Sequence, residues 1–167
     1  MSDEYTARYG LPLLRAGQAQ KEMSHNEALT LLDVLVQGSV EAVGLDIPPE
    51  EPGLGQCWAV GGTPTGVWSG HRHAVAAWTD GGWRFAPATE GMTVWSIDDG
   101  AYARVSDGGW HIGELCGTVV RIDGDPVIGP RQSPIADPAG GATMDSEARS
   151  AIAAILTAMR AHGLIGS

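Results

Sequence analysis

Basic residues are scarce in this sequence, which has ten lysines and arginines against twenty aspartates and glutamates and a formal net charge of −10. Binding to a nucleic-acid backbone depends on clustered Lys and Arg side chains that neutralise phosphates. The charge balance therefore argues against a DNA or RNA partner.

Long hydrophobic runs are missing as well, because nowhere do eighteen apolar residues follow one another. The opening MSDEYTARYG is acidic and has neither the basic nor the apolar region of a secretory signal. We expect a protein that folds in a cytoplasm, without membrane insertion and without export by a signal peptide.

Cysteine is rare, with only Cys57 and Cys116, and the two form no CxxC motif. Two residues are too few for a disulfide framework, so free thiols in a reducing compartment are the default expectation. A single disulfide between them is the alternative that the sequence leaves open.

The first periodic segment follows MSHNEALTLLD. Between Ser24 and about Val43 the apolar residues recur at a spacing near 3.6, which predicts an amphipathic helix. Ser24 and Glu27 have the spacing of a capping box at its start. His25, Asn26 and Glu27 are then helix-start residues, and a metal or catalytic role for them is the alternative.

Glycine and proline are frequent in the middle of the chain, where short β-type runs are separated by turn residues: QCWAV, GVW, HAVAAWT, WRFA, MTVWSI, AYARV, WHIGE, TVVRI and PVIG. Such runs favour an antiparallel arrangement, because parallel strands need crossover connections. The sequence predicts an α+β fold that is mainly β. A small antiparallel body (meander, sandwich or barrel) over residues 47–136 would lie between an arm and helix in 1–46 and a linker and helix in 137–167.

The tetrapeptide DGGW occurs twice, ending at Trp83 and at Trp110, and each copy lies between two β-type runs. Asp and Gly supply the positive φ angles of tight hairpins, so the repeat predicts two similar hairpins, each with a core indole. Indoles on the surface would instead suit stacking against a sugar. The candidate glycan contacts are Trp68, His71, His73 and Trp78.

The last segment, from Asp145 to His162, predicts a second helix with Asp145 as N-cap and Gly163 at a Schellman stop. Its apolar residues step by four, three and four, which is typical of a seam against another helix. The seam consists of Ala148, Ile152, Ile155 and Met159. It would pack on the same chain or join identical helices around a symmetry axis.

A catalytic or metal site is hard to find. His71, His73 and His111 are a possible zinc set, but their places in turn and strand favour no metal. Glu90 and Asp107 would be the acid and nucleophile if the chain degraded glycans. Without a recognisable nucleophile or phosphate loop, the prediction is a protein that is not an enzyme and has no cofactor.

The run LPLLRAGQAQKEMSHNEALTLLD, residues 11–33, resembles the signature of a family of uncharacterised proteins encoded by bacteriophages and prophage-like gene transfer agents, where variants of LPLLQAGQAQKEVTHNEAL recur. Residues 55–95 resemble the same family in their Gly-x-x-Trp, Trp-x-Gly, Gly-Gly-Trp and Gly-x-x-Val-Trp pattern. The C-terminal DSEARSAIAAILTAMRAHGLI is similar to the closing helix of several phage tail and fibre proteins.

The resemblance implies a virion component such as a tail fibre or head spike, particularly of gene transfer agents from alphaproteobacteria. Family members often continue into longer fibre regions, whereas this sequence has no fibre repeats, which favours a base or adaptor. Gln18, Gln20 and Lys21 then become interface or entry-loop residues on an extended arm, residues 1–22, that orders on binding.

Two functions follow as expectations. The first is a non-enzymatic structural virion protein that is used in host attachment, forms a trimer or pentamer and contacts capsid, spike fibre or tail proteins. It would fold in the bacterial cytoplasm, lie on the particle surface and be released by lysis. The alternative is a carbohydrate-binding module for host capsule or envelope polysaccharide.

Overall fold

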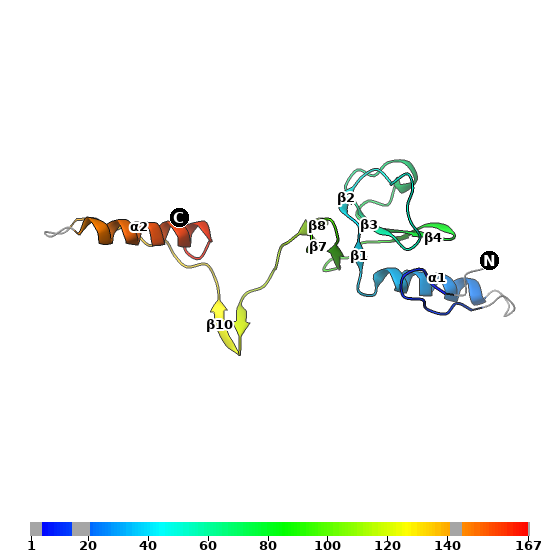
Figure 1. The fold of residues 1–167 in the computed structure, drawn as a ribbon, viewed down its shortest axis with the longest axis horizontal. Helices are drawn as coiled ribbons and strands as arrows, with labels where there is room; N and C mark the ends of the chain where they lie inside the picture. Colours follow the sequence, from blue (N-terminus) through cyan, green and yellow to red (C-terminus); the bar gives the residue numbers. More distant parts are fainter. Residues whose placement is uncertain (1–4, 15–20, 141–144, 167) are drawn as a thin grey trace. The chain divides into compact units, whose positions relative to one another are not determined.

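The structure is a computed structural model that describes residues 5–14, 21–140 and 145–166. The chain divides into two compact units, Met1–Glu114 and Leu115–Ser167, and Figure 1 follows it through both. The β body therefore ends near residue 114. Residues 115–136, which the sequence assigned to that body, belong to the second unit instead.

Within its described residues, the first unit contains one α-helix, a 3₁₀ turn at Gly66–Trp68 and eight strands. In chain order the helix and strands are α1 (Lys21–Leu35), β1 (Ser39–Val40), β2 (Val43–Leu45), β3 (Cys57–Val60), β4 (Val75–Thr79), β5 (Gly82–Ala86), β6 (Thr93–Ser96), β7 (Ala101–Ser106) and β8 (Gly109–Ile112). The second unit contains β9 (Val120–Ile122), β10 (Asp125–Ile128) and α2 (Ser146–Ala161). The predicted α+β, mainly β class with an N-terminal and a C-terminal helix is confirmed.

The first unit is built from two four-stranded sheets, ordered β2-β3-β4-β5 and β1-β6-β7-β8. Each sheet is an antiparallel meander of three strands with one short strand added in parallel at its edge. The expectation that parallel pairs are absent is therefore wrong. The two parallel pairings, β1 with β6 and β2 with β3, match only two residues each. The connection from β2 to β3 is irregular chain, and the connection from β1 to β6 passes through the other sheet.

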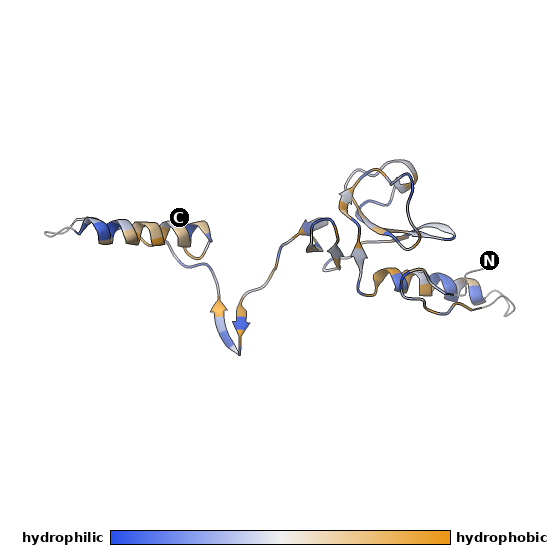
Figure 2. Cartoon of the chain, in the orientation of Figure 1, coloured by the Kyte–Doolittle hydropathy of each residue, from blue (hydrophilic) through white to orange (hydrophobic). Residues whose placement is uncertain are grey.

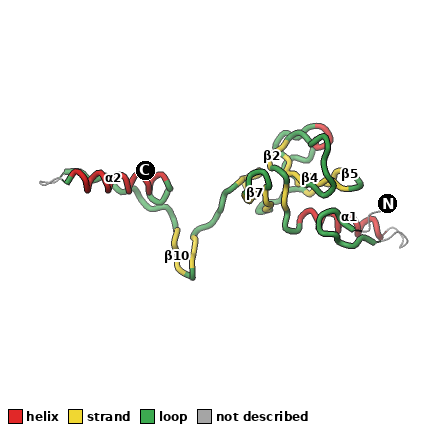
Figure 3. Tube along the Cα trace, viewed as in Figure 1, coloured by secondary structure: helices red, strands yellow, loops and turns green. Residues whose placement is uncertain are grey.

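Two DGGW hairpins join β4 to β5 and β7 to β8, as the repeat predicts. In the second hairpin Asp107 and Gly108 both have positive φ, which is the backbone of a type I′ turn. In the first hairpin positive φ appears at Gly82 instead. The run GVW, expected to be a strand, is the 3₁₀ turn that ends at Trp68, the short helical segment on the long loop in Figure 3.

Strand β3 is buried on both faces, so alternate residues enter two different cores. Cys57 and Ala59 join a core that also contains Val34 from α1 and Val94 and Ala103 from the second sheet. On the opposite face is an aromatic core, which gathers Trp58, Val60, Trp68 and Ala76 with half-buried Ala42, Leu45, Trp78, Trp83 and Phe85.

Helix α1 begins and ends earlier than predicted. It starts at Lys21, so Ser24 lies inside the helix and the proposed capping box does not form. It ends at Leu35 because Gln37 turns the chain with φ +44. The next residue, Gly38, lies close to the second sheet, since a Cβ there would come within 3.1 Å of Val94 Cγ1. Val40 and Val43, assigned to the helical stripe, are strand residues.

Residues 5–14 fold back along α1 and are held there by the buried carboxylate of Asp33. Its oxygens accept hydrogen bonds from Thr6 Oγ1 and from the backbone N–H groups of Arg8 and Tyr9, each at 2.8 Å. The Arg8 guanidinium donates to the carbonyls of Asp33 and Val34 at the end of the helix. This part of the arm is therefore ordered against its own chain, contrary to the expectation that it orders only on binding.

In the second unit, β9 and β10 form a hairpin around Asp123 and Gly124, both with positive φ. Helix α2 has the predicted ends: the Asp145 side chain accepts from the Ala148 N–H, and the Leu164 N–H donates to the Met159 carbonyl in a Schellman arrangement. Among the described segments, no helix is both long enough and apolar enough to cross a membrane.

The Asp33 carboxylate yields a stability prediction. In Asp33→Asn an amide NH₂ faces a backbone N–H donor, so we expect the free energy of unfolding to fall by about 2–4 kcal/mol. Urea denaturation followed by tryptophan fluorescence measures the change. Asp98→Asn, at an exposed position, is the control and should stay within about 0.5 kcal/mol of the parent. Equal losses in both variants would contradict the role given to Asp33.

Candidate functional site

The predicted glycan contacts lie in or beside the aromatic core. Trp68 is fully buried, with its ring centroid 5.2 Å from that of Trp83 and 6.4 Å from that of Trp58. Trp78 is half-buried with its ring edge-to-face against Trp83 at 5.1 Å. The prediction that Trp68 contacts a glycan is therefore wrong, because the helical turn that replaces the expected strand directs its indole into the core.

The two histidines of the same loop have different surroundings. The His71 ring stacks on Phe85 at 3.6 Å, which covers one of its faces. His73 has a left-handed backbone, and its carbonyl accepts the Trp110 indole N–H at 2.8 Å. Burial lowers the pKa of His73, with Arg72 acting in the same direction. These contacts point to loop anchoring.

The candidate metal and acid–base residues lie in loops and turns and on strand β8. In the ranges that the structure describes, no group of three or more His, Cys, Asp or Glu residues is arranged to hold a metal ion. His111 lies on β8 and its ring contacts the Ser106 carbonyl at 3.1 Å and the Glu114 carboxylate at 3.6 Å. Glu90 and Asp107 are both exposed, in two different turns.

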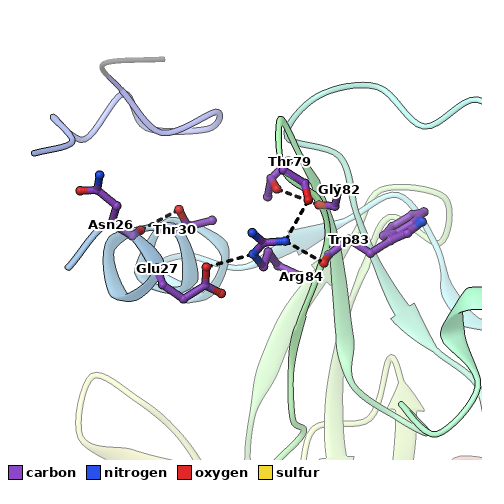
Figure 4. A network of polar contacts seen from close by, with 8 residues as sticks. Asn26, Glu27, Thr30, Thr79, Gly82, Trp83 and Arg84 are labelled. Atoms are coloured by element: carbon purple, nitrogen blue, oxygen red, sulfur yellow. Dashed lines mark hydrogen bonds and ion pairs between the residues drawn. The ribbon is translucent and has the colours of Figure 1, made fainter. Parts of the chain in front are cut away.

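The His25-Asn26-Glu27 cluster is built into contacts between segments. The Asn26 amide exchanges two hydrogen bonds with the backbone of Leu14, at 2.8 and 3.0 Å. Glu27 pairs with Arg84 of β5 at 3.0 Å, and Arg84 also donates to the carbonyls of Gly81 and Trp83 (Figure 4). Asn26 and Glu27 therefore fix the N-terminal segment and the first DGGW hairpin to α1, whereas His25 is exposed.

Trp95 and Tyr102 are aromatic residues that the sequence reasoning did not select. They are cross-strand partners on β6 and β7, and their rings meet edge-to-face with centroids 5.0 Å apart. Trp95 is 38% exposed and Tyr102 is 59% exposed. A clue was present in the sequence, since Thr93 and Trp95 alternate with Val94 and Ser96 and so occupy the opposite face of the strand.

The predicted interface residues divide into two groups. Gln18 and Gln20 lie outside the described residues, as does the side chain of Lys21. Ala148, Ile152 and Ile155 are exposed on α2, and Met159 is half-buried. The buried residue of the helix is Leu156, which lies about 40° around the axis from Ile152 and about 100° from Ile155.

A family described as "Protein of unknown function (DUF2793)" matches residues 25–111, which is just over half of the 167 residues. The chain belongs to this family. Comparison with curated proteins finds no match. The DUF2793 match begins inside α1 and ends in β8, so it follows the two-sheet body of the first unit and stops before the second.

The DUF2793 region contains one of the two cysteines. Both thiols are free, Cys57 in the core and Cys116 exposed in the second unit. Burial raises the pKa of the Cys57 thiol to about 11. Only about one in a thousand Cys57 thiols would be ionised at pH 8, and the thiolate is the reactive form.

We therefore expect a maleimide or disulfide reagent at pH 8 to modify Cys116 rapidly and Cys57 only after unfolding. Mass spectrometry of tryptic peptides at successive times measures both sites, and the Cys116→Ser variant isolates Cys57. Rapid labelling of folded Cys57 would show that the core opens around β3.

Proposed function

We propose that the chain is a non-enzymatic structural protein of a phage or gene transfer agent particle, and that it is a homo-oligomeric base or adaptor of a head spike or tail fibre used in host attachment. The N-terminal signature supports the assignment to a phage or gene transfer agent particle, and the second unit supports the assignment as a homo-oligomer. Its partners would be copies of itself and capsid, spike-fibre or tail proteins. It would fold in the bacterial cytoplasm and leave the cell on the particle surface by lysis.

The observation that carries the proposal is the poor core of the second unit. Among its described residues only Leu156 and Ile165 are buried hydrophobics, whereas ten large hydrophobic side chains are exposed. These ten are Leu115, Val119, Val120, Ile122, Val127, Ile128, Ile135, Ile152, Ile155 and Leu164. Small units with so little buried apolar surface are usually stabilised by association.

The β9–β10 hairpin supports the same inference. Every residue of both strands is exposed, and the hydropathy colouring of Figure 2 shows hydrophobic positions in this hairpin and in α2. An isolated two-stranded hairpin is marginally stable in water, and its open edges are suited to pairing with another strand. A symmetric oligomer supplies such partners from identical chains.

Among the described residues, two arginines link helix α2 to the chain that precedes it. Arg160 pairs with Asp137 at 3.1 Å and donates to the Ile135 carbonyl, and Arg149 donates to the Pro138 carbonyl at 3.2 Å. These contacts lie on the side of the helix that carries Leu156, about 100° around the axis from Ile155 and about 40° from Ile152. Both isoleucines are exposed, so they are left available for an identical helix.

The exposed carboxylates agree with a non-enzymatic role. Glu90 and Asp107 are turn residues with exposed side chains, whereas the acids of a glycosidase flank a bound substrate. Asp107 has a turn role that explains its identity, because its φ of +50 is one that Asp and Asn tolerate.

The oligomer prediction is tested by the mass of the purified protein in solution, measured by light scattering on a sizing column. We expect a discrete trimer or pentamer for the parent chain. Ile155→Asp should lower the mass toward that of the monomer, because it places a charge in the proposed seam. Ala154→Asp, next to it but on another exposed face, should keep the parent mass. A monomeric parent, or equal effects of both variants, would contradict the proposal.

A further inference from the structure

The exposed face of the second sheet carries an aromatic pair, Trp95 and Tyr102, whose rings pack edge-to-face against each other. Strand β6 alternates exposed and buried residues, with Thr93 and Trp95 outward and Val94 and Ser96 inward. All six tryptophans lie in the described residues, and the other five are buried or half-buried. Trp95 is thus the one tryptophan whose side chain is exposed, and it lies on the face of β6 that points away from the core.

A hollow lies beside this pair. It has a volume of about 640 Å³ and is lined by Gln37, Gly38, Thr93, Trp95 and Tyr102. This volume is within the usual range of small-ligand sites. Gln37 is held at the rim by the positive-φ turn that ends α1, and the Gly38 carbonyl accepts a hydrogen bond from the Trp95 backbone N–H at 2.8 Å.

The lining combines groups that suit a neutral sugar. An amide and a hydroxyl, from Gln37 and Thr93, donate and accept hydrogen bonds, and the two aromatic rings offer apolar faces. A pyranose has the complementary pattern, with hydroxyls around its rim and C–H groups on its faces. The lining contains no charged side chain, which disfavours phosphorylated or nucleic-acid ligands, as does the net charge of −10.

We propose that Trp95 and Tyr102 form a stacking platform for one neutral hexopyranose unit of a glycan, and that Gln37 and Thr93 bind its hydroxyls. The site lies wholly in the first unit and uses none of the residues first expected to contact glycan. It goes beyond the structural role proposed above and does not depend on the oligomer. On a particle surface it would let the protein bind a host polysaccharide directly.

The test uses the indole N–H signals of the ¹⁵N-labelled full chain in two-dimensional NMR. Trp95→Phe identifies the Trp95 signal. The probes are neutral hexasaccharides of cello, laminari, malto, manno and galacto type. We expect at least one of them to shift the Trp95 signal in a saturable way, while the signal of buried Trp68 stays in place.

Variants then locate the site. Tyr102→Ala and Gln37→Ala should each weaken the affinity for that hexasaccharide, Tyr102→Ala by about ten-fold or more. Tyr5→Ala is the matched control, because Tyr5 is 58% exposed and lies outside the hollow. It should leave the affinity unchanged. Unfolding midpoints equal to that of the parent show that the variants are folded.

Three results would overturn the proposal. The first is that no hexasaccharide shifts the Trp95 signal, and the second is that Tyr5→Ala weakens binding as much as Tyr102→Ala. The third is that Trp95→Phe or Tyr102→Ala lowers the solution mass while no sugar binds, which would make this face a contact between copies. Ile155→Asp separates the two proposals, because it should change the solution mass and leave the sugar titration of each chain intact.

Discussion

The first unit depends on one buried carboxylate. Asp33 binds the chain segment that precedes α1 through three hydrogen bonds, and the Arg8 side chain in that segment caps the carbonyls at the end of the same helix. Arg8 also donates to Ser39 at 2.8 Å, the residue where β1 begins. A single side-chain cluster therefore fixes the entry of the helix relative to its exit, and the exit is where the chain enters the two sheets.

From there the segment 39–45 connects the sheets, because β1 completes one of them and β2 completes the other. The Trp110 indole adds a second link, since its N–H binds the His73 carbonyl of the loop that precedes β4. Both parallel strands are edge strands of two or three residues. Such short edges offer few free backbone groups to a foreign strand, which limits unwanted edge-to-edge association.

Local patterns were enough to predict much of this fold. Eight of the β-type runs became strands, and the Asp-Gly turns and the caps of α2 follow from residues that are neighbours in sequence. The errors came where distant contacts decide. Ser24 has the spacing of a cap, but the helix starts earlier, and Val40 continues a helical period but pairs with Ser96. The Trp68 glycan candidate failed for the same reason, since exposure depends on packing that no local pattern records.

The shared origin of the two parallel strands has a kinetic consequence. Ser39 pairs with Trp95 and Val43 pairs with Ala59, so neither sheet is complete until chain far beyond the helix has been synthesised and folded. Pairings so distant in sequence make folding slower than local ones, because loop-closure entropy is lost before the contacts form. Strand β2 can pair as soon as β3 has emerged, whereas β1 must wait for β6. On the ribosome the second sheet would therefore stay without its edge strand longer than the first.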